Sequence, residues 1–80
     1  MALTAEQELI LDYLCEREAE TAAQVARYAS LPKPETIAIL HYLADKGYVE
    51  RTRWGRAYMY HITDAGRKAA IMPNPVVWTA

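Results

Sequence analysis

Basic and aromatic side chains gather in one short stretch of the chain, RTRWGRAYMY, residues 51–60. Arg51, Arg53 and Arg56 surround Trp54 there. Guanidinium groups bind phosphate oxygens and can enter the minor groove of DNA, and an aromatic ring among them can shape the tip of a turn. The alternative is that these charges only keep an edge strand soluble and unpaired. The stretch is therefore the first candidate for contact with a polyanion.

A second group lies in TIAILHYLADKGY, residues 36–48, whose apolar spacing predicts a helix. At 100° per residue, the side expected to face the core holds Thr36, Ile39, Leu40 and Leu43. The opposite arc holds Ala38, His41, Tyr42 and Asp45, with Ile37 at its edge. That arc has no Arg, Lys, Asn or Gln, the side chains that read guanine or adenine through paired hydrogen bonds. Its apolar, tyrosine-bearing character also suits a protein partner, so two kinds of partner stay open.

Catalytic and metal-binding patterns do not emerge from the sequence. Cys15 is the single cysteine, and together with His41 and His61 it has no recognisable metal-ligand spacing. We expect Cys15 to be a packing thiol. The residues offer no nucleophile–base pair, carboxylate pair or glycine-rich phosphate loop, so we expect no enzymatic activity, no cofactor and no metal.

The length and charge pattern limit the class of protein. Eighty residues suffice for one domain with a modest core, and no apolar run approaches the roughly 20 residues that cross a bilayer. The start of the chain has no secretory signal, so we expect a cytoplasmic protein without membrane contact. Net charge is −1, but residues 1–45 carry three basic and eight acidic side chains, whereas residues 46–80 carry six basic and two acidic. This polarity indicates a polyanion-binding surface or a solvated charged face.

Three helices are predicted before residue 47. Thr4 with Gln7 and Thr21 with Gln24 have the form of capping boxes, which predict helices over about residues 4–18 and 21–30. Prolines at positions 32 and 34 begin a third helix over about residues 33–46, because proline is accepted in the first turn of a helix. Gly47 can supply its left-handed cap.

After Gly47 the pattern changes to two β-rich runs, YVERTR and AYMYHI, which predict a hairpin. With Trp54 and Gly55 as turn residues, Arg53 lies opposite Arg56, and Arg51 lies opposite Tyr58. The same register places Val49 opposite Tyr60, and we expect Tyr58, Tyr60 and Ile62 to be core residues. Thr63 then caps a final short helix, DAGRKAAIM.

This order of elements predicts an α+β, mostly α fold, a winged helix-turn-helix. Residues 21–70 resemble the DNA-binding half of bacterial regulators of the MarR, PadR and ArsR kind, chiefly through LADKGYVER and YHITDAGRKA. The resemblance implies that the helix of residues 33–46 enters the major groove of double-stranded DNA and that the hairpin, the wing, contacts its backbone. Transferred to this sequence, the DNA-binding candidates are Lys33, Ile37, Ala38, His41, Tyr42, Arg51, Arg53, Trp54 and Arg56. The alternative is a protein–protein interaction module that uses the apolar face of the same helix.

The chain is predicted to divide into a domain of residues 1–72 and an apolar tail of residues 73–80. The tail contains Val76, Val77 and Trp78 after a Pro-Asn-Pro turn. Regulators of this fold usually pair so that their two-fold symmetry matches a DNA palindrome. We therefore expect a homodimer to which these three residues contribute, with docking of the tail onto its own chain as the alternative.

Overall fold

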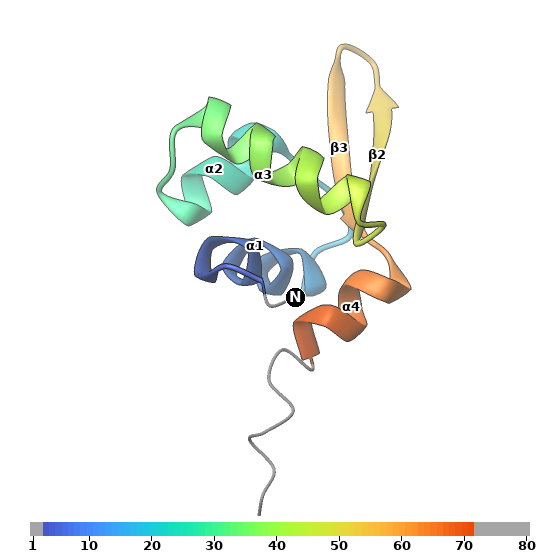
Figure 1. Cartoon of the computed structure of the whole chain (residues 1–80). Coiled ribbons are helices and arrows are strands. Elements are labelled where there is room, and N and C mark those ends of the chain that lie inside the picture. Colours follow the sequence, from blue (N-terminus) through green and yellow to red (C-terminus); the bar gives the residue numbers. More distant parts are fainter. Residues whose placement is uncertain (1–2, 72–80) are drawn as a thin grey trace, which may run out of the picture.

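The computed structural model describes residues 3–71, which fold as helices around a small antiparallel sheet with a projecting hairpin (Figure 1). The elements in order are α1 (Ala5–Cys15), β1 (Glu20–Thr21), α2 (Ala22–Ala29), α3 (Lys33–Asp45), β2 (Val49–Trp54), β3 (Ala57–Ile62) and α4 (Asp64–Ile71). The strands lie in the order β1-β3-β2, so β3 is central. This is the predicted winged helix-turn-helix. The tail of residues 73–80 lies outside the described residues.

Both predicted capping boxes form. The hydroxyl of Thr4 accepts a hydrogen bond from the backbone N–H of Gln7 at 3.1 Å, and the side-chain oxygen of Gln7 accepts one from the N–H of Thr4 at 3.0 Å. Thr21 and Gln24 make the same exchange at 3.2 and 2.8 Å. Each box satisfies two N–H groups that a helix start leaves without partners, which is why α1 and α2 begin where the sequence predicted.

The end of α1 corrects the sequence analysis. The helix stops at Cys15 rather than near Glu18, with Glu16 as its cap. The chain then straightens, so that Glu20 and Thr21 pair with Tyr60 and Met59 of β3. A strand of two residues has no periodicity to read, so β1 was missed. In contrast, α3 ends within one residue of its predicted end, and Gly47 takes the expected positive φ of 81°.

The register of the hairpin also differs from the prediction. Gly55 and Arg56 are the turn residues, and Trp54 pairs with Ala57. Gly55 has a φ of +64°, and a positive φ at the first central position of a two-residue turn favours glycine. Arg53 therefore lies opposite Tyr58 instead of Arg56. The same shift places Arg51 opposite Tyr60 and Val49 opposite Ile62, so the like-charged pair expected at the tip does not form.

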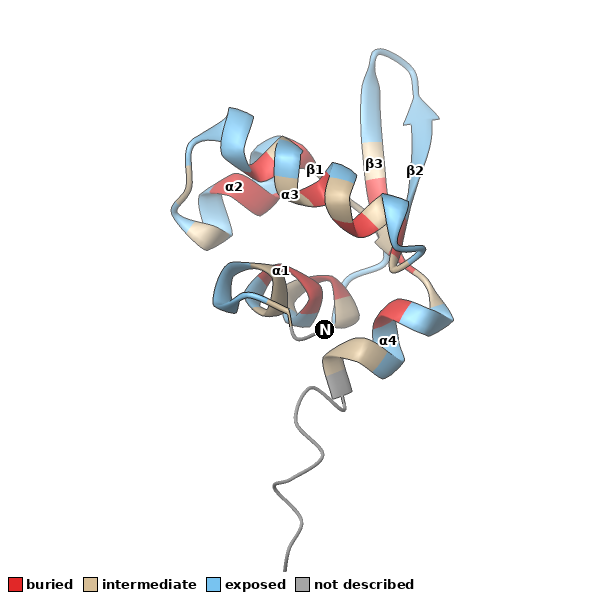
Figure 2. Cartoon of the chain, viewed as in Figure 1, coloured by how far each residue is buried: buried red, intermediate tan, exposed pale blue. Residues whose placement is uncertain are grey.

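The core lies between α1, α2, α3 and the base of the hairpin (Figure 2). Its fully enclosed side chains include Ile10, Leu11, Leu14, Val25, Leu40 and Leu43. Tyr60 and Ile62 are buried as expected, but Tyr58 is 40% exposed and is not a core residue. Cys15 is partly buried against the core, and this burial raises the pKa of its thiol, as suits a packing cysteine. No helix within residues 3–71 has the length and hydropathy to cross a membrane.

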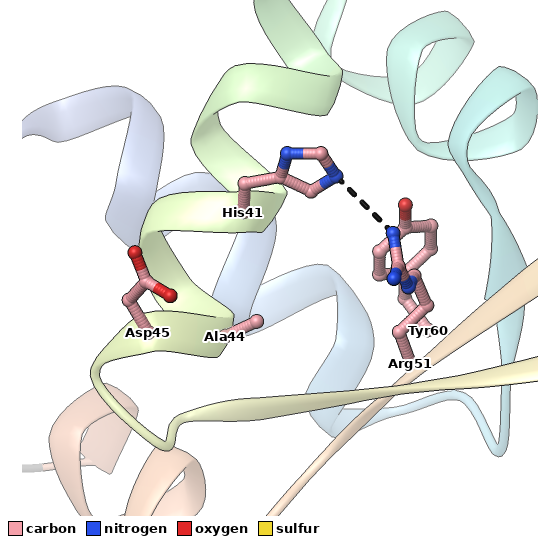
Figure 3. Close-up of a pocket in the computed structure, with 5 residues that line it drawn as sticks. All are labelled: His41, Ala44, Asp45, Arg51 and Tyr60. Carbon is pink, nitrogen blue, oxygen red and sulfur yellow. Dashed lines mark hydrogen bonds between the residues drawn. The ribbon is translucent and has the colours of Figure 1, made fainter.

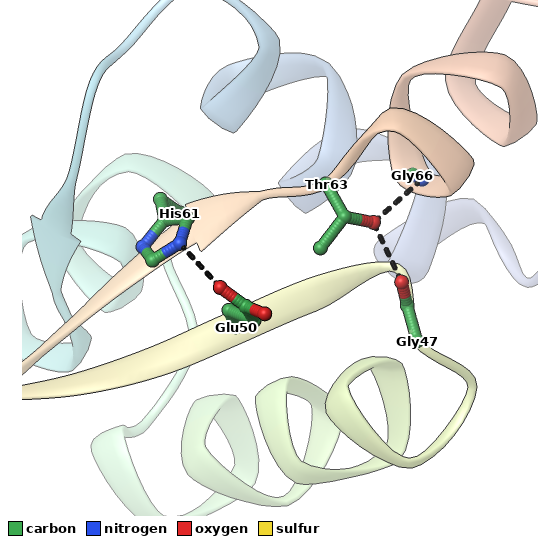
Figure 4. Close-up of polar contacts among 5 residues, drawn as sticks. All are labelled: Gly47, Glu50, His61, Thr63 and Gly66. Atoms are coloured by element: carbon green, nitrogen blue, oxygen red, sulfur yellow. Dashed lines mark hydrogen bonds and ion pairs between the residues drawn. The ribbon is translucent and has the colours of Figure 1, made fainter.

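The start of α4 is tied to the turn that follows α3 (Figure 4). The Thr63 hydroxyl donates to the carbonyl oxygen of Gly47 at 2.6 Å and accepts from the N–H of Gly66 at 3.1 Å. The backbone N–H of Thr63 also donates to the carbonyl oxygen of Tyr48 at 3.0 Å. Thr63 thus caps α4, as predicted, and at the same time fixes where the hairpin leaves α3.

Candidate nucleic-acid interface

The hairpin of β2 and β3 is the wing. A groove runs between α3 and the face of the wing that carries Arg51 and Tyr60. Because alternate residues of a strand share one face, Arg51 and Arg53 lie on the same side of the hairpin as the buried Val49. A cavity of about 470 Å³ at one end of the groove is lined by His41, Ala44, Asp45, Arg51 and Tyr60 (Figure 3). A second, of about 410 Å³, is lined by Thr21, Ala22, Ala23, Lys33, Ile37, Arg56, Ala57, Tyr58 and Tyr60. Tyr60 belongs to both, and we call the two cavities together the wing groove.

Tyr58 holds two arginines on the groove side of the wing. The guanidinium carbon of Arg51 lies 4.3 Å from the centre of the Tyr58 ring, and that of Arg53 lies 5.7 Å from it. Arg53 also donates from Nε to the carbonyl oxygen of Gly55 at 3.2 Å. A cation over an aromatic face is attracted by the ring, so both guanidinium groups are positioned before any ligand arrives. Sequence reasoning missed this role because it expected Tyr58 to be a core residue.

The DNA-binding candidates on the outward side of α3 divide into an exposed group and a half-buried group. His41 is exposed, and its Nε2 lies 3.5 Å from Nη1 of Arg51. Ala38 is also exposed on the outward arc. Ile37 is half-buried, packs against the core and lines the wing groove. Tyr42 is half-buried with the Lys46 ammonium 5.5 Å from its ring centre, so less of it is free for a partner than the sequence suggested.

Basic side chains also stand at the far end of the wing groove. Lys33, in the first turn of α3, and Arg56, in the hairpin turn, line the second cavity from opposite sides. Both side chains are exposed. Lys33, Arg51 and Arg56 thus line the wing groove, and a fourth cation, Arg53, lies beside it near the ring of Tyr58. This clustering matches the charge polarity of the sequence, since three of the four come from the basic second part of the chain.

Trp54 lies apart from this groove. It is 74% exposed and, with Thr52, Met59 and His61, borders a hollow of about 380 Å³ on the other face of the wing. On that face Nε2 of His61 lies 3.0 Å from Oε1 of Glu50 (Figure 4). The structure therefore separates Trp54 from the arginines with which the sequence grouped it. Within residues 3–71, no group of three or more His, Cys, Asp or Glu side chains is placed to hold a metal ion.

The arrangement can bind phosphate but has little with which to read bases. Four cations and His41 face or flank the wing groove, and guanidinium and ammonium groups bind phosphate through charge-assisted hydrogen bonds. The outward arc of α3 offers the imidazole of His41, the half-buried phenol of Tyr42 and the carboxylate of Asp45 as its hydrogen-bonding groups, and none of these is suited to paired hydrogen bonds with guanine or adenine. Phosphate contacts position a protein on DNA without specifying sequence. The predicted residues of the tail, Val76, Val77 and Trp78, lie outside the described part of the chain.

Comparisons with known proteins agree with this fold. The IclR helix-turn-helix domain matches residues 9–53, more than half of the chain. No curated protein sequence matches significantly. Similar solved structures include BpsR of Bordetella bronchiseptica, studied for the regulation of its DNA binding by 6-hydroxynicotinic acid, with 19% identity and a TM-score of 0.84 over 94% of this chain and 56% of that one. The oxidized form of MarR from E. coli shares 21% identity and a TM-score of 0.83 over 96% of this chain and 57% of that one.

A third similar structure is ZitR of Lactococcus lactis, a variant of which was solved in complex with DNA, with 24% identity and a TM-score of 0.79 over 86% of this chain and 49% of that one. The chain thus spans about half the length of the solved proteins it matches. The expected likeness to MarR-type regulators is confirmed at the level of the fold. The sequence family that matches is the IclR helix-turn-helix domain. The chain belongs to the IclR helix-turn-helix domain family and has the winged helix-turn-helix fold of MarR-type transcriptional regulators.

Proposed function

We propose that this protein is a small transcriptional regulator that binds double-stranded DNA. The observation that carries the proposal is the convergence of Lys33, Arg51, Arg53 and Arg56 on one groove between α3 and the wing. The IclR-type domain match and the DNA complex of the structurally similar ZitR support it. In this proposal the protein works in the cytoplasm, and residues 1–72 form the DNA-binding domain.

The proposed binding mode assigns different roles to helix and wing. The outward arc of α3, with Ala38, His41 and Tyr42, lies in the major groove. The wing arginines and Lys33 contact the phosphate backbone, and Trp54 lies at the wing tip. Because the arc has no side chain suited to paired hydrogen bonds with bases, affinity comes mainly from phosphates, and sequence preference is modest. Ile37 contributes at most an apolar contact at the edge of the arc.

A salt titration tests DNA binding directly. Each phosphate neutralised by the protein contributes a slope of about −0.9 to the plot of log affinity against log salt concentration. We expect the purified protein to bind a mixed-sequence duplex with a slope near −3 or steeper, measured by fluorescence anisotropy. Absence of binding at low salt, or an affinity that does not change with salt, would reject the proposal.

The alternative, a protein-interaction module, has less support from the structure. Its candidate anchors on α3 were Ile37 and Tyr42, and both are half-buried. The buried centre of a stable protein–protein interface needs aromatic or aliphatic side chains that are free to enter a partner's pocket. The exposed residues of the outward arc of α3 are Ala38, His41 and Asp45, none of which is a large apolar anchor, so DNA remains the better-supported partner.

We further propose a homodimer that involves the apolar tail. One winged helix covers one half-site of DNA, and two-fold pairing matches a palindromic site. The proposal assigns contacts to Val76, Val77 and Trp78, which follow α4 in the sequence. Truncation after Met72 is expected to convert a dimer into a folded monomer in sedimentation equilibrium. A full-length chain that stays monomeric at high micromolar concentration would reject the dimer.

A further inference from the structure

His41 and Arg51 meet at one end of the wing groove (Figure 3). Nη1 of Arg51 lies 3.5 Å from Nε2 of His41, and both side chains are exposed. A guanidinium group only donates hydrogen bonds, so a hydrogen bond across this distance requires Nε2 of His41 as the acceptor. The Tyr58 ring supports the guanidinium of Arg51 at 4.3 Å. The cation is therefore held beside the imidazole, and the two can receive a ligand together.

The groups around the imidazole come from three elements. Asp45 follows one turn later on α3, Arg51 comes from β2, and Tyr60 comes from β3. In Figure 3 the His41 ring points toward Arg51 and away from Asp45. With a proton on Nε2, both nitrogen atoms would be donors, and the two like charges would face each other with mutual repulsion. An anion between the two groups would remove this repulsion and accept a hydrogen bond from each.

We propose that a backbone phosphate of bound DNA occupies the space between His41 and Arg51, and that its binding takes up one proton from solvent at Nε2 of His41. This inference rests on the proposed DNA binding. The phosphodiester shares one negative charge over two non-bridging oxygens, one of which can accept from the guanidinium and the other from the imidazolium, and charge-assisted hydrogen bonds of this kind are the stronger ones. His41 thus changes from an acceptor for Arg51 to a donor for DNA.

Proton uptake makes affinity depend on pH. Imidazole is the side chain that gains and loses a proton between about pH 5 and 8. Because the complex holds one more proton than the free protein, affinity falls as pH rises, by up to about tenfold per pH unit. The chain has two histidines, and His61 lies on the other face of the wing beside Glu50. His61 is therefore a matched control.

The test compares wild type with His41→Gln, His41→Lys and His61→Gln on one mixed-sequence duplex at pH 6 to 8 and constant ionic strength. We expect wild type and His61→Gln to lose affinity about tenfold or more over this range. His41→Gln, which is always neutral, should stay weak and independent of pH. His41→Lys, which is always charged, should also be independent of pH but bind more tightly than His41→Gln.

Two results would overturn the inference while leaving the proposed function intact. The first is wild-type affinity that is independent of pH, which would mean that the neutral imidazole contacts DNA or that it makes no contact. The second is an unchanged pH dependence in His41→Gln. A wild-type protein that binds no duplex at any pH would instead reject the proposed function. Calorimetry in two buffers of different ionisation enthalpy counts the protons directly, and zero uptake by wild type at pH 6.5 would also overturn the inference.

Discussion

Replacing Arg51 and Arg53 together by alanine is expected to weaken binding to every duplex roughly 100-fold. Two charge-assisted contacts at about 1.5 kcal/mol each account for this loss. Because both guanidinium groups lie over Tyr58 on the groove side of the wing, they are expected to contact phosphates rather than bases. The slope of log affinity against log salt should therefore become less steep by about 1.8. Titrations at several salt concentrations give both quantities.

A matched control separates a local contact from a general loss of charge. Arg17 and Arg27 are exposed and line a different hollow, beside the stacked rings of Tyr13 and Tyr28. Their double replacement by alanine removes the same net charge, and we expect less than a threefold change in affinity, because exposed charges beyond the Debye length are largely screened at 0.1 M salt. Equal losses in the two double variants would show that the wing groove is not the binding surface.

The contribution of the Tyr58 ring, which supports the two arginines, can be tested without changing any charge. Tyr58→Phe keeps the ring under Arg51 and should bind nearly as wild type does. Tyr58→Ala removes the ring that supports Arg51 and leaves Arg53 with only its hydrogen bond to Gly55, so it should weaken binding by a smaller factor than loss of the arginines, with almost the same salt slope. This split between affinity and salt slope would identify Tyr58 as a positioning residue.

Gly66→Ala is expected to cost the domain at least about 3 kcal/mol of its free energy of unfolding. A Cβ at this position would overlap the carbonyl oxygen of Tyr48 and come within 2.7 Å of Cγ1 of Ile62. The Tyr48 carbonyl cannot move away freely, because it accepts a hydrogen bond from the backbone N–H of Thr63. For a domain whose total stability is of the order of 5–15 kcal/mol, this loss is large. Urea unfolding followed by circular dichroism measures it.

Gly55→Ala provides the comparison for Gly66→Ala. A Cβ at Gly55 meets no atom within 4 Å, but its φ of +64° disfavours any residue with a Cβ. We expect a loss of about 1–2 kcal/mol there. A Gly66→Ala protein as stable as wild type would mean that α4 does not pack closely against the start of the wing.

Local interactions explain which elements were predictable from the sequence. Both capping boxes act within four residues, so the starts of α1 and α2 followed from Thr4 and Thr21. The strand β1 forms by pairing with β3, which lies about 40 residues away in the sequence, and the residues Glu20–Thr21 alone do not predict a strand. The hairpin register failed for a related reason. Trp-Gly and Gly-Arg are both plausible two-residue turns with a positive φ at glycine, and the pairing of Trp54 with Ala57 decides between them.

The candidate site was predictable in composition but not in arrangement. The charge pattern of the sequence indicated the wing arginines, and the structure places Arg51, Arg56 and Lys33 in the lining of one groove. Tyr58 lies on the same face of β3 as the buried Tyr60 and Ile62, but it is two residues nearer the wing tip, beyond the core, and it lines the groove instead. Trp54 was grouped with the arginines by sequence proximity. However, neighbouring residues of a strand point to opposite faces, so Trp54 lies on the other side of the wing.

The pairing of β1 with β3 has a mechanical consequence. Because Thr21 is both the last residue of β1 and the N-cap of α2, two hydrogen-bonded residues fasten the wing to the start of the helix pair that carries α3. This pairing connects the wing to the start of α2, so hydrogen bonds of the protein itself help to set the distance between α3 and the wing. In the proposed complex, the phosphates of the duplex must match the spacing between α3 and the wing. The DNA then bears the energy of adjusting its groove width, and base steps that deform easily would fit better than stiff ones.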